Sequence, residues 1–529
     1  MYGDAMTRPP QIRPADPDLF QLGVTCWDDG DHTVIWQPIT GRHVRLHHQT
    51  ISMLRADPLS LRLGPVRARL DRFYLLRRSP RPDWPQLVPV RSRLLLTLVD
   101  EATLWLPVPG YRGAGGHGFR AFQLSSDAHR AWQAINDSRT VQQIADLSGV
   151  GLVTVQALLT TLASPELQAL QLRDEPLQRR DLGLERLVDI PRPSNSRPEH
   201  LHGPAGETTL TWYHLHAITD GSTHFDDRET TIAHSLGLPH PALAGQRYGA
   251  RLYDQLHATG VVPDDALVVE IGCGTGELAE AWLEQAGPHA HSRYLRVDLS
   301  PELLRTQATR VQSPAILGDG TALPLRDRSV DLIVNNEVIA DMSSVPFDVE
   351  HPSERPLDQE ILAIATKHGV ELAPGRNWVN LGAWRFVAEI ARVLKPGGSA
   401  WLSEFGVLDE VPQEAVQLDH PEVSIQFNHL AQVARGCGLR ASIQPLAEAL
   451  KIDLQAHQLA RHSWLAVRSL ARSRGVHLQA RAWTPETLAP LLPTPVSGLH
   501  WVPFHDEGPG PLFSRFYALM LQQPADSAD

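Results

Sequence analysis

The stretch LVVEIGCGTGELAEAW, residues 267–282, constrains the fold more than any other part of the chain. An apolar run ends in an acid, three glycines follow at alternate positions, and a helical pattern begins directly after them. Glycine has no Cβ, so a backbone rich in it can turn sharply and approach a ligand closely. The stretch therefore predicts a strand, a tight glycine loop and a helix at the ligand-binding edge of a parallel sheet.

The spacing of the glycines indicates which class of ligand the loop can bind. A dinucleotide-binding loop has the pattern G-x-G-x-x-G and holds pyrophosphate at the helix N-terminus. Here the pattern is G-x-G-x-G, preceded by Glu270. A carboxylate at that position repels pyrophosphate and attracts an ammonium group. A ligand with an amino acid moiety and a nucleoside, such as S-adenosylmethionine, therefore fits better than NAD.

From about residue 265, apolar strand patterns alternate with helical ones, which predicts a parallel α/β sheet. Further strands are expected at 294–298, 315–318, 331–336 and 400–405. Asp298 ends the second strand, where it can bind both ribose hydroxyls, and Asp319 ends the third, where it can accept a hydrogen bond from the adenine amino group. The predicted cofactor site comprises Glu270, Gly272, Gly274, Gly276, Asp298, Leu299, Asp319, Gly320 and Asn335.

Residues 267–405 resemble class I S-adenosylmethionine-dependent methyltransferases. The resemblance lies in VVEIGCGTG, the acid of RVDLS, GDGTALPLRDRSVDLIV and ARVLKPGGSAWLSE. It implies S-adenosyl-L-methionine as the cofactor and a Rossmann-like methyltransferase sheet of seven strands. A closing pair of strands is expected at 499–504 and 515–521.

A narrower resemblance is to the MidA family of complex I assembly methyltransferases, which act on a protein arginine. It lies in YLRVDLSPELLRTQ, NNEVIADM and PLFSRFYALML. The chain departs from the family in two places: Asp341 stands one position late, and the glycine loop reads Gly272-Cys273-Gly274 instead of G-P-G.

Asn336, Glu337 and Asp341 follow the fourth strand, where the methyl group of the cofactor should lie, and are the predicted catalytic residues. Carboxylates there can orient an amine or guanidinium acceptor and stabilise developing positive charge. The alternative is that Glu337 caps the following helix and faces solvent. A lid or substrate pocket is expected from Tyr213, His214, His216, His224 and, within the 343–380 insertion, Trp378. These histidines lack strict ligand spacing, so no metal is predicted.

Four domain segments are expected: an N-terminal α+β region (1–90), a winged-helix-like region (91–188), an exposed linker (189–206) and the methyltransferase domain (207–525). In the second segment, strands and a glycine-rich loop precede three helices at 125–136, 140–149 and 151–164. The third helix has no Lys or Arg, so it cannot neutralise phosphates and no nucleic acid is expected.

The same order of strands and helices is similar to PqqD-like peptide-recognition domains, which bind a leader peptide at a sheet edge. That resemblance implies a peptide partner, and an acidic leader would suit residues 55–93, which contain ten arginines and three aspartates. The alternative is that residues 1–188 only pack on the catalytic domain.

The composition is that of a globular protein: 42% of residues are hydrophobic, 20% are charged and the formal net charge is −12. No apolar run is long enough to span a bilayer, so no membrane partner is expected. Three distant cysteines favour a reducing, cytoplasmic location. The leading hypothesis is a peptide or protein N-methyltransferase acting on an arginine or amine, such as one that modifies ribosomally synthesised precursor peptides. The alternatives are a small-molecule methyltransferase and a cofactor-binding assembly factor without turnover.

Overall fold

The computed structural model describes residues 13–16, 19–36, 43–56, 63–72, 75–76, 83–92, 96–98, 102–113, 116–174, 210–216, 218, 231–417, 420–473, 475–492, 496–497 and 499–525. The chain divides into two compact units. The first comprises Met1–Pro193, Leu459–Leu478 and Ala489–Trp501, and the second comprises Ser194–Gln458, Gln479–Leu488 and Val502–Asp529. The expected linker, 189–206, lies outside the described residues.

The first unit begins with an antiparallel sheet in the order β1-β2-β3-β4. Its strands are β1 (Arg13–Pro14), β2 (Thr25–Asp29), β3 (His32–Trp36) and β4 (His43–His47), and two helices follow, α1 (His48–Ala56) and α2 (Gly64–Arg72). Apolar residues of these strands and helices form one core, which includes Ile35, Leu54 and Leu70.

Three helices form a second core in the same unit, and all three were predicted: α3 (Ser126–Ala134), α4 (Val141–Ser148) and α5 (Leu152–Leu162). Ser125 caps α3, Thr140 and Gln143 form a capping box on α4, and Gly149 ends α4 with a φ of 67°. Beside them β5 (Val88–Arg91) pairs antiparallel with β9 (Leu170–Arg173).

Two segments late in the sequence also belong to the first unit. Strand β22 (Val496–Ser497) pairs with β6 (Leu96–Leu98). In the same sheet β6 pairs with β7 (Thr103–Gly113), and β7 pairs with β8 (Gly116–Gln123). Helix α16 (Arg461–Ser473) contacts these strands and buries Val467 and Leu470. The prediction of one continuous domain over 207–525 is therefore wrong, because these residues complete a sheet begun by the N-terminal part. Much of the expected glycine-rich loop is strand as well.

The second unit is built on a sheet of eight strands. Seven lie in the order β12-β11-β10-β13-β16-β24-β20, and β19 pairs with β16 in addition, so the predicted count of seven is one short. The strands are β10 (Val268–Ile271), β11 (Tyr294–Asp298), β12 (Ala315–Leu317), β13 (Val330–Asn336), β16 (Leu394–Val407), β19 (Ile425–Gln426), β20 (Arg440–Pro445) and β24 (Phe516–Gln522). All pairings are parallel except those of β24.

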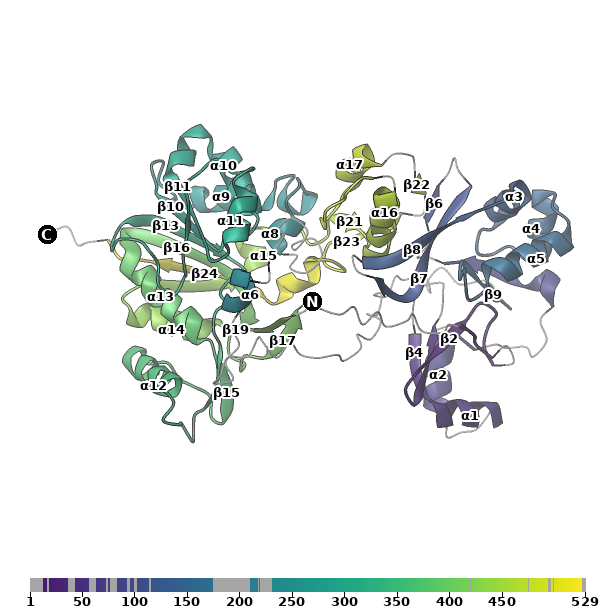
Figure 1. The fold of residues 1–529 in the computed structure, drawn as a ribbon, viewed down its shortest axis with the longest axis horizontal. Coiled ribbons are helices and arrows are strands. Elements are labelled where there is room, and N and C mark those ends of the chain that lie inside the picture. Colours follow the sequence, from purple (N-terminus) through teal and green to yellow (C-terminus); the bar gives the residue numbers. More distant parts are fainter. Residues whose placement is uncertain are drawn as a thin grey trace. The chain divides into compact units, whose positions relative to one another are not determined.

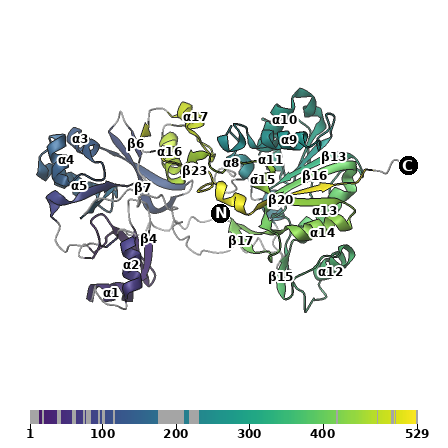
Figure 2. The ribbon, with the colours of Figure 1, turned by 180° about the vertical axis from the view of Figure 1, so that it is seen from behind.

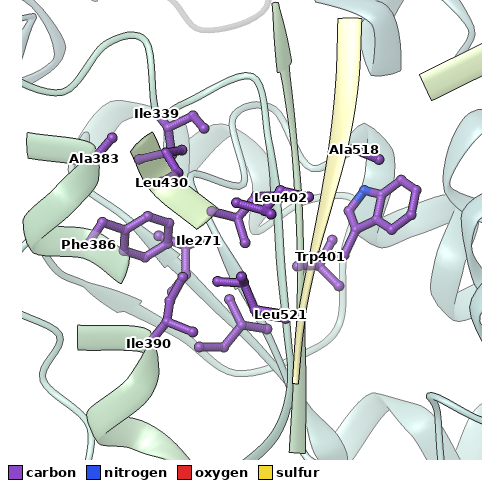
Figure 3. Packing of buried hydrophobic residues seen from close by; sticks show 14 of the residues in the cluster. Ile271, Ile339, Ala383, Phe386, Ile390, Trp401, Leu402, Leu430, Ala518 and Leu521 are labelled. Carbon is purple, nitrogen blue, oxygen red and sulfur yellow. The ribbon is translucent and has the colours of Figure 1, made fainter. Parts of the chain in front are cut away.

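Helices cover both faces of this sheet (Figures 1 and 2). On one side lie α9 (Tyr248–Ala258), α10 (Glu277–Ala286) and α11 (Pro301–Gln307), and on the other lie α13 (Leu381–Val393) and α14 (Phe427–Gly436). Figure 3 shows how strand alternation serves both faces: Leu402 and Leu521 point toward Phe386 of α13, whereas Trp401 and Ala518 point the opposite way. A sheet buried on both faces explains the nearly continuous apolar strands in the sequence.

Shorter elements complete the second unit. They are α6 (Thr211–His216), α8 (Ile232–Ser235), α12 (Pro356–His368), α15 (Leu446–Ala449), α17 (Pro485–Leu488) and the strand pairs β14 (Val345–Asp348) with β15 (Arg376–Val379) and β17 (Glu414–Gln417) with β18 (His420–Val423). The predicted closing hairpin is wrong: β24 pairs with β16 and β20, and β23 (Trp501–Pro503) pairs with β21 (His457–Leu459).

Within the described residues, no single helix is long and apolar enough to cross a membrane, although α4 and α5, which meet at a bend of 118°, pass the same length and composition test as a pair.

Candidate functional site

A cavity of about 320 Å³ lies in the second unit at the carboxyl ends of β10, β11, β12 and β13. Its lining includes the glycine loop, the residues that follow β11 and β12, and the segment from Asn336 to Ser343. This is the edge of a parallel sheet at which ligands bind in open α/β folds.

The glycine loop has a backbone that only glycine adopts without strain. Gly272, Gly274 and Gly276 have φ values of 72°, 51° and 82°. A Cβ on Gly272 would lie 2.2 Å from Cγ2 of Val338, and one on Gly276 would lie 3.0 Å from Cγ2 of Val311. The missing side chains thus leave a backbone cradle along the cavity, and that cradle fits the extended amino acid moiety of S-adenosylmethionine.

Glu270 lines the cavity and is 3% exposed. Its Oε2 accepts a hydrogen bond from the Tyr294 hydroxyl at 3.0 Å. Burial raises its pKa to about 8, against the smaller opposing effects of Tyr294 and Arg296. Without ligand this carboxyl is therefore mostly protonated at neutral pH, and a nearby ammonium would favour its ionised form.

Asp298 also lines the cavity, with both carboxylate oxygens bound to the backbone. Oδ2 accepts from Gly274 N at 2.9 Å and Oδ1 accepts from Ser300 N at 2.8 Å. These bonds hold the carboxylate against the glycine loop and leave it lone pairs for a hydroxyl. Burial raises its pKa.

The residues predicted to surround the nucleoside, Leu299, Asp319 and Gly320, all line the cavity. Asp319 Oδ1 accepts from the backbone N and hydroxyl of Thr321, each at 2.8 Å. A Cβ on Gly320 would lie 2.8 Å from Cε of Met342, so a larger residue there would require the Met342 side chain to move.

Asn335 does not line the cavity, although it was predicted to bind the cofactor. It is fully buried, and its Nδ2 donates to the Ile271 carbonyl at 3.0 Å. Asn335 and Ile271 are register partners on neighbouring strands. Its amide therefore ties β13 to the strand that carries the glycine loop.

Asn336 lines the cavity, and its side-chain amide is held in one orientation. Oδ1 accepts from the Tyr248 hydroxyl at 2.7 Å and from the Ser403 hydroxyl at 2.8 Å. Two donors on the oxygen direct the amide nitrogen the other way, and Nδ2 donates to Glu337 Oε1 at 2.9 Å. Asn336 thus positions the neighbouring carboxylate.

Glu337 has a φ of 55°, a left-handed conformation that is uncommon for a residue other than glycine. Its Oε1 also accepts from Ile232 N at 2.7 Å, at the start of α8. Burial raises its pKa to about 8, and Glu422 adds to that rise. The alternative that Glu337 caps the helix after it in the sequence is wrong, since turns follow it and the backbone that it binds belongs to α8.

Three further carboxylates in the lining, Glu277, Glu404 and Glu422, were not predicted. Glu404 lies on β16 and is 2% exposed, and its pKa is raised well above the usual value by burial and then by Glu337, Glu422 and Asp341. The sequence signal for Glu404 was available, because it is the second-last residue of the strand predicted at 400–405. Glu422 comes from the β17–β18 hairpin, which has no motif.

Helix α6 brings one of the predicted substrate residues to the cavity. His214 lines it, and its Nε2 lies 3.3 Å from Oδ2 of Asp341. The backbone adds a second link, because Leu210 N donates to the Asp341 carbonyl at 3.1 Å. The predicted catalytic Asp341 is thereby joined to the segment that was expected to form a lid.

The other predicted substrate residues do not line the cavity. Tyr213 is buried with Leu303 and Ile218, and His216 is exposed. Trp378 lies on β15, in a hairpin with β14, and His224 lies outside the described residues.

Acidic residues outnumber basic ones in the described lining of the cavity. Four of the carboxyl groups in the lining are Glu337, Asp341, Glu404 and Glu422. Among the described residues of the lining, Arg385 is the only arginine or lysine, and it is paired with Glu360 at 2.6 Å. Across the described parts of the chain, no group of three His, Cys, Asp or Glu residues is arranged to hold a metal ion.

Comparison with known proteins agrees with this geometry. Residues 269–348 match the family model described as a methyltransferase domain. Among curated proteins, no significant relative was found.

Solved structures with partial similarity include three from different organisms. A putative sarcosine dimethylglycine methyltransferase from Galdieria sulphuraria is 14% identical, with coverage of 52% of this chain and 85% of that one and a TM-score of 0.27. An uncharacterised protein from Burkholderia thailandensis is 17% identical, with coverage of 60% and 87% and a TM-score of 0.33. A Haemonchus contortus phosphoethanolamine N-methyltransferase in complex with S-adenosylhomocysteine is 13% identical, with coverage of 52% of each chain and a TM-score of 0.30.

Residues 269–348 thus belong to a methyltransferase domain. The chain is an enzyme, and its cofactor is S-adenosylmethionine.

Proposed function

We propose that this protein is an N-methyltransferase whose acceptor is a positively charged nitrogen, an amine or a guanidinium, on a peptide or protein. One observation carries the proposal: Glu337, Asp341, Glu404 and Glu422 line the same cavity as the cofactor loop, and among the described residues the one arginine in that lining is paired with Glu360. Such a site repels anionic acceptors and attracts cationic ones.

The chemistry of transfer suits these carboxyls. The bound cofactor supplies an electrophilic methyl group on a sulfonium. The N–C bond forms as the S–C bond breaks, the sulfonium becomes a thioether, and one proton must leave the acceptor nitrogen. The protein mainly has to position and desolvate the acceptor and to take up that proton.

Glu337 has the central role in the proposal. It lines the cavity and is held by Ile232 N and Asn336 Nδ2, so its carboxylate has one orientation. Glu404, Glu422 and Asp341 supply further negative charge. Burial and mutual repulsion favour the protonated form of some of these groups, and a cation bound beside them would favour the ionised form. Binding of the acceptor should therefore release protons.

A peptide or protein acceptor is proposed from the first unit. Its three helices beside the β5–β9 pair are similar to PqqD-like domains, and the chain resembles the MidA family, whose members modify protein arginine. An acidic leader would complement the arginines within residues 55–93.

Cys26, Cys273 and Cys437 are free thiols, which supports a cytoplasmic location.

Full-length protein with methyl-labelled cofactor provides the test. Peptides encoded beside its gene, small amines such as agmatine and putrescine, and matched hydroxyl or carboxyl compounds would be offered separately. Label on nitrogen of a peptide supports the proposal. Efficient label on the free small amines alone would establish the small-molecule alternative, and label on oxygen or carbon would contradict the charge argument.

A further inference from the structure

The segment Gln479–Leu488 belongs to the second unit although both of its sequence neighbours, 459–478 and 489–501, belong to the first. It carries Arg481, whose side chain is 4% exposed. A buried arginine needs charged and hydrogen-bonding partners. One partner of Arg481, Gln479, lies two residues away, and the other two lie more than 200 residues away in the sequence.

The first partner is Glu277. Arg481 Nη2 lies 2.6 Å from Glu277 Oε1, which also accepts from Arg310 Nη1 at 2.6 Å. Burial alone would raise the pKa of Glu277, but the two arginines outweigh it and lower the pKa to about 2. Glu277 is the first residue of α10, directly after Gly276 of the cofactor loop, and it lines the cavity.

The second partner is helix α8. Arg481 Nη1 donates to the His234 carbonyl, and Ala482 N donates to the Ser235 carbonyl at 2.7 Å. Gly237 gives the guanidinium its room, because a Cβ there would lie 2.2 Å from Arg481 Nη1.

The opposite end of α8 faces the reaction site. Ile232 N donates to Glu337 Oε1 at 2.7 Å, and Thr231 and Ala233 line the cavity. Arg481 therefore holds the C-terminal end of the short helix whose N-terminal amide orients Glu337. Arg481 itself does not line the cavity.

We propose that Arg481 is a positioning residue with two connections, one to the cofactor loop through Glu277 and one to the Glu337 carboxylate through α8. The first connection concerns the cofactor, whose identity is established. The second rests on the role proposed for Glu337, but its structural readout needs no acceptor.

Two measurements on the full-length protein separate the connections. Calorimetric titration measures the affinity for S-adenosylhomocysteine and so tests the connection to the cofactor loop. The rate of amide hydrogen exchange in the peptide containing Ile232 tests the hydrogen bond from Ile232 N to Glu337. Arg481→Gln should weaken S-adenosylhomocysteine binding at least about tenfold and speed exchange at Ile232.

Arg310→Gln is the matched variant, because Arg310 shares Glu277 with Arg481 and directs its other Nη to Glu280, which also lies on α10 and not on α8. It should weaken cofactor binding and leave exchange at Ile232 unchanged. Arg305→Gln, at an exposed arginine paired with Glu302, should change neither.

Arg481→Lys guards against a general folding defect, since a lysine can still pair with Glu277 but cannot also reach the His234 carbonyl in the same fork. It should recover most of the cofactor affinity and retain fast exchange at Ile232. Arg481→Gln with unchanged cofactor affinity, or with unchanged exchange, would overturn the proposal. So would equal defects in both readouts for Arg481→Gln and Arg310→Gln. These outcomes do not depend on which acceptor is methylated.

Discussion

Glu337 combines three properties that rarely coincide in a residue with only a structural role. Its backbone is left-handed, its side chain is only partly exposed, and it lines a cavity beside other acids. A left-handed residue other than glycine costs roughly 1–3 kcal/mol and persists where the surroundings fix it. Here Tyr248, Ser403 and Asn336 fix it through successive hydrogen bonds.

Glu337→Gln should stabilise the protein at high pH while abolishing methyl transfer. The carboxyl has a usual pKa of 4.5 and a pKa of about 8 in the fold. The raised value means that the proton bound by the folded state adds stability that is full below pH 4.5 and is lost as the pH rises to about 8. Glutamine keeps an oxygen that accepts these hydrogen bonds but does not ionise, so the variant should not lose this stability as the pH rises.

Urea unfolding at pH 5, 6.5 and 8 checks this prediction. The difference in free energy of unfolding, variant minus wild type, should grow by about 1.4 kcal/mol per pH unit within that window. Glu410→Gln, at an exposed acid, is the control. A difference that does not change with pH would show that Glu337 is already ionised in the folded protein.

Tyr248→Phe tests the first link in the same series of hydrogen bonds. The hydroxyl donates to Asn336 Oδ1, so its removal leaves that oxygen only the Ser403 donor and frees the amide to rotate. We expect kcat to fall about tenfold or more, with S-adenosylhomocysteine affinity unchanged. A loss confined to cofactor affinity would place the effect elsewhere.

At the scale of elements, the glycine loop makes the sharpest prediction. Gly272→Ala combines a positive φ with a Cβ 2.2 Å from Val338, and should abolish detectable cofactor binding. Gly287→Ala is matched, because its φ is 87° but nothing lies within 4 Å of the added Cβ. It should bind S-adenosylhomocysteine as the wild type does. Equal losses in both variants would mean that backbone strain, and not closure of the cradle, is responsible.

Elements with a strong local pattern were predictable from the sequence. Strands β10, β11 and β13, the loop glycines and the acids at the strand ends follow from apolar runs that stop at polar residues. Asn335 shows the limit of this reasoning. Asn335 and Asn336 are adjacent at the end of β13 and their side chains point to opposite sides, so only the pairing of the strands decides which of the two lines the cavity. Glu422 and Arg481 reach the site from a hairpin and a late segment with no motif, so nothing local marks them.

At the scale of the whole molecule, the chain does not place one domain after another. It leaves the second unit at residue 459, returns for Gln479–Leu488, and leaves again before β24 completes the sheet. A boundary drawn at a linker assumes that each domain is continuous, and pairing between distant strands such as β6 and β22 leaves no periodic signal.

This organisation predicts that the methyltransferase part is unstable by itself. In a fragment spanning residues 207–529, α16 would lose β6, β7 and β8 and expose Val467, Leu470 and Ala471, which are buried in the full chain. We expect aggregation or a strong loss of thermal stability, measured by light scattering and calorimetry. A monomeric fragment with the full-length melting temperature would show that these contacts are dispensable.

The central claim is that the acidic cavity selects a positively charged nitrogen. The most direct measurement is mass spectrometry of methyl transfer to one accepted peptide and to the same peptide with arginine replaced by citrulline, or lysine by norleucine. The account predicts a gain of one methyl group on the charged peptide and none on its neutral counterpart. Equal methylation of both would contradict it.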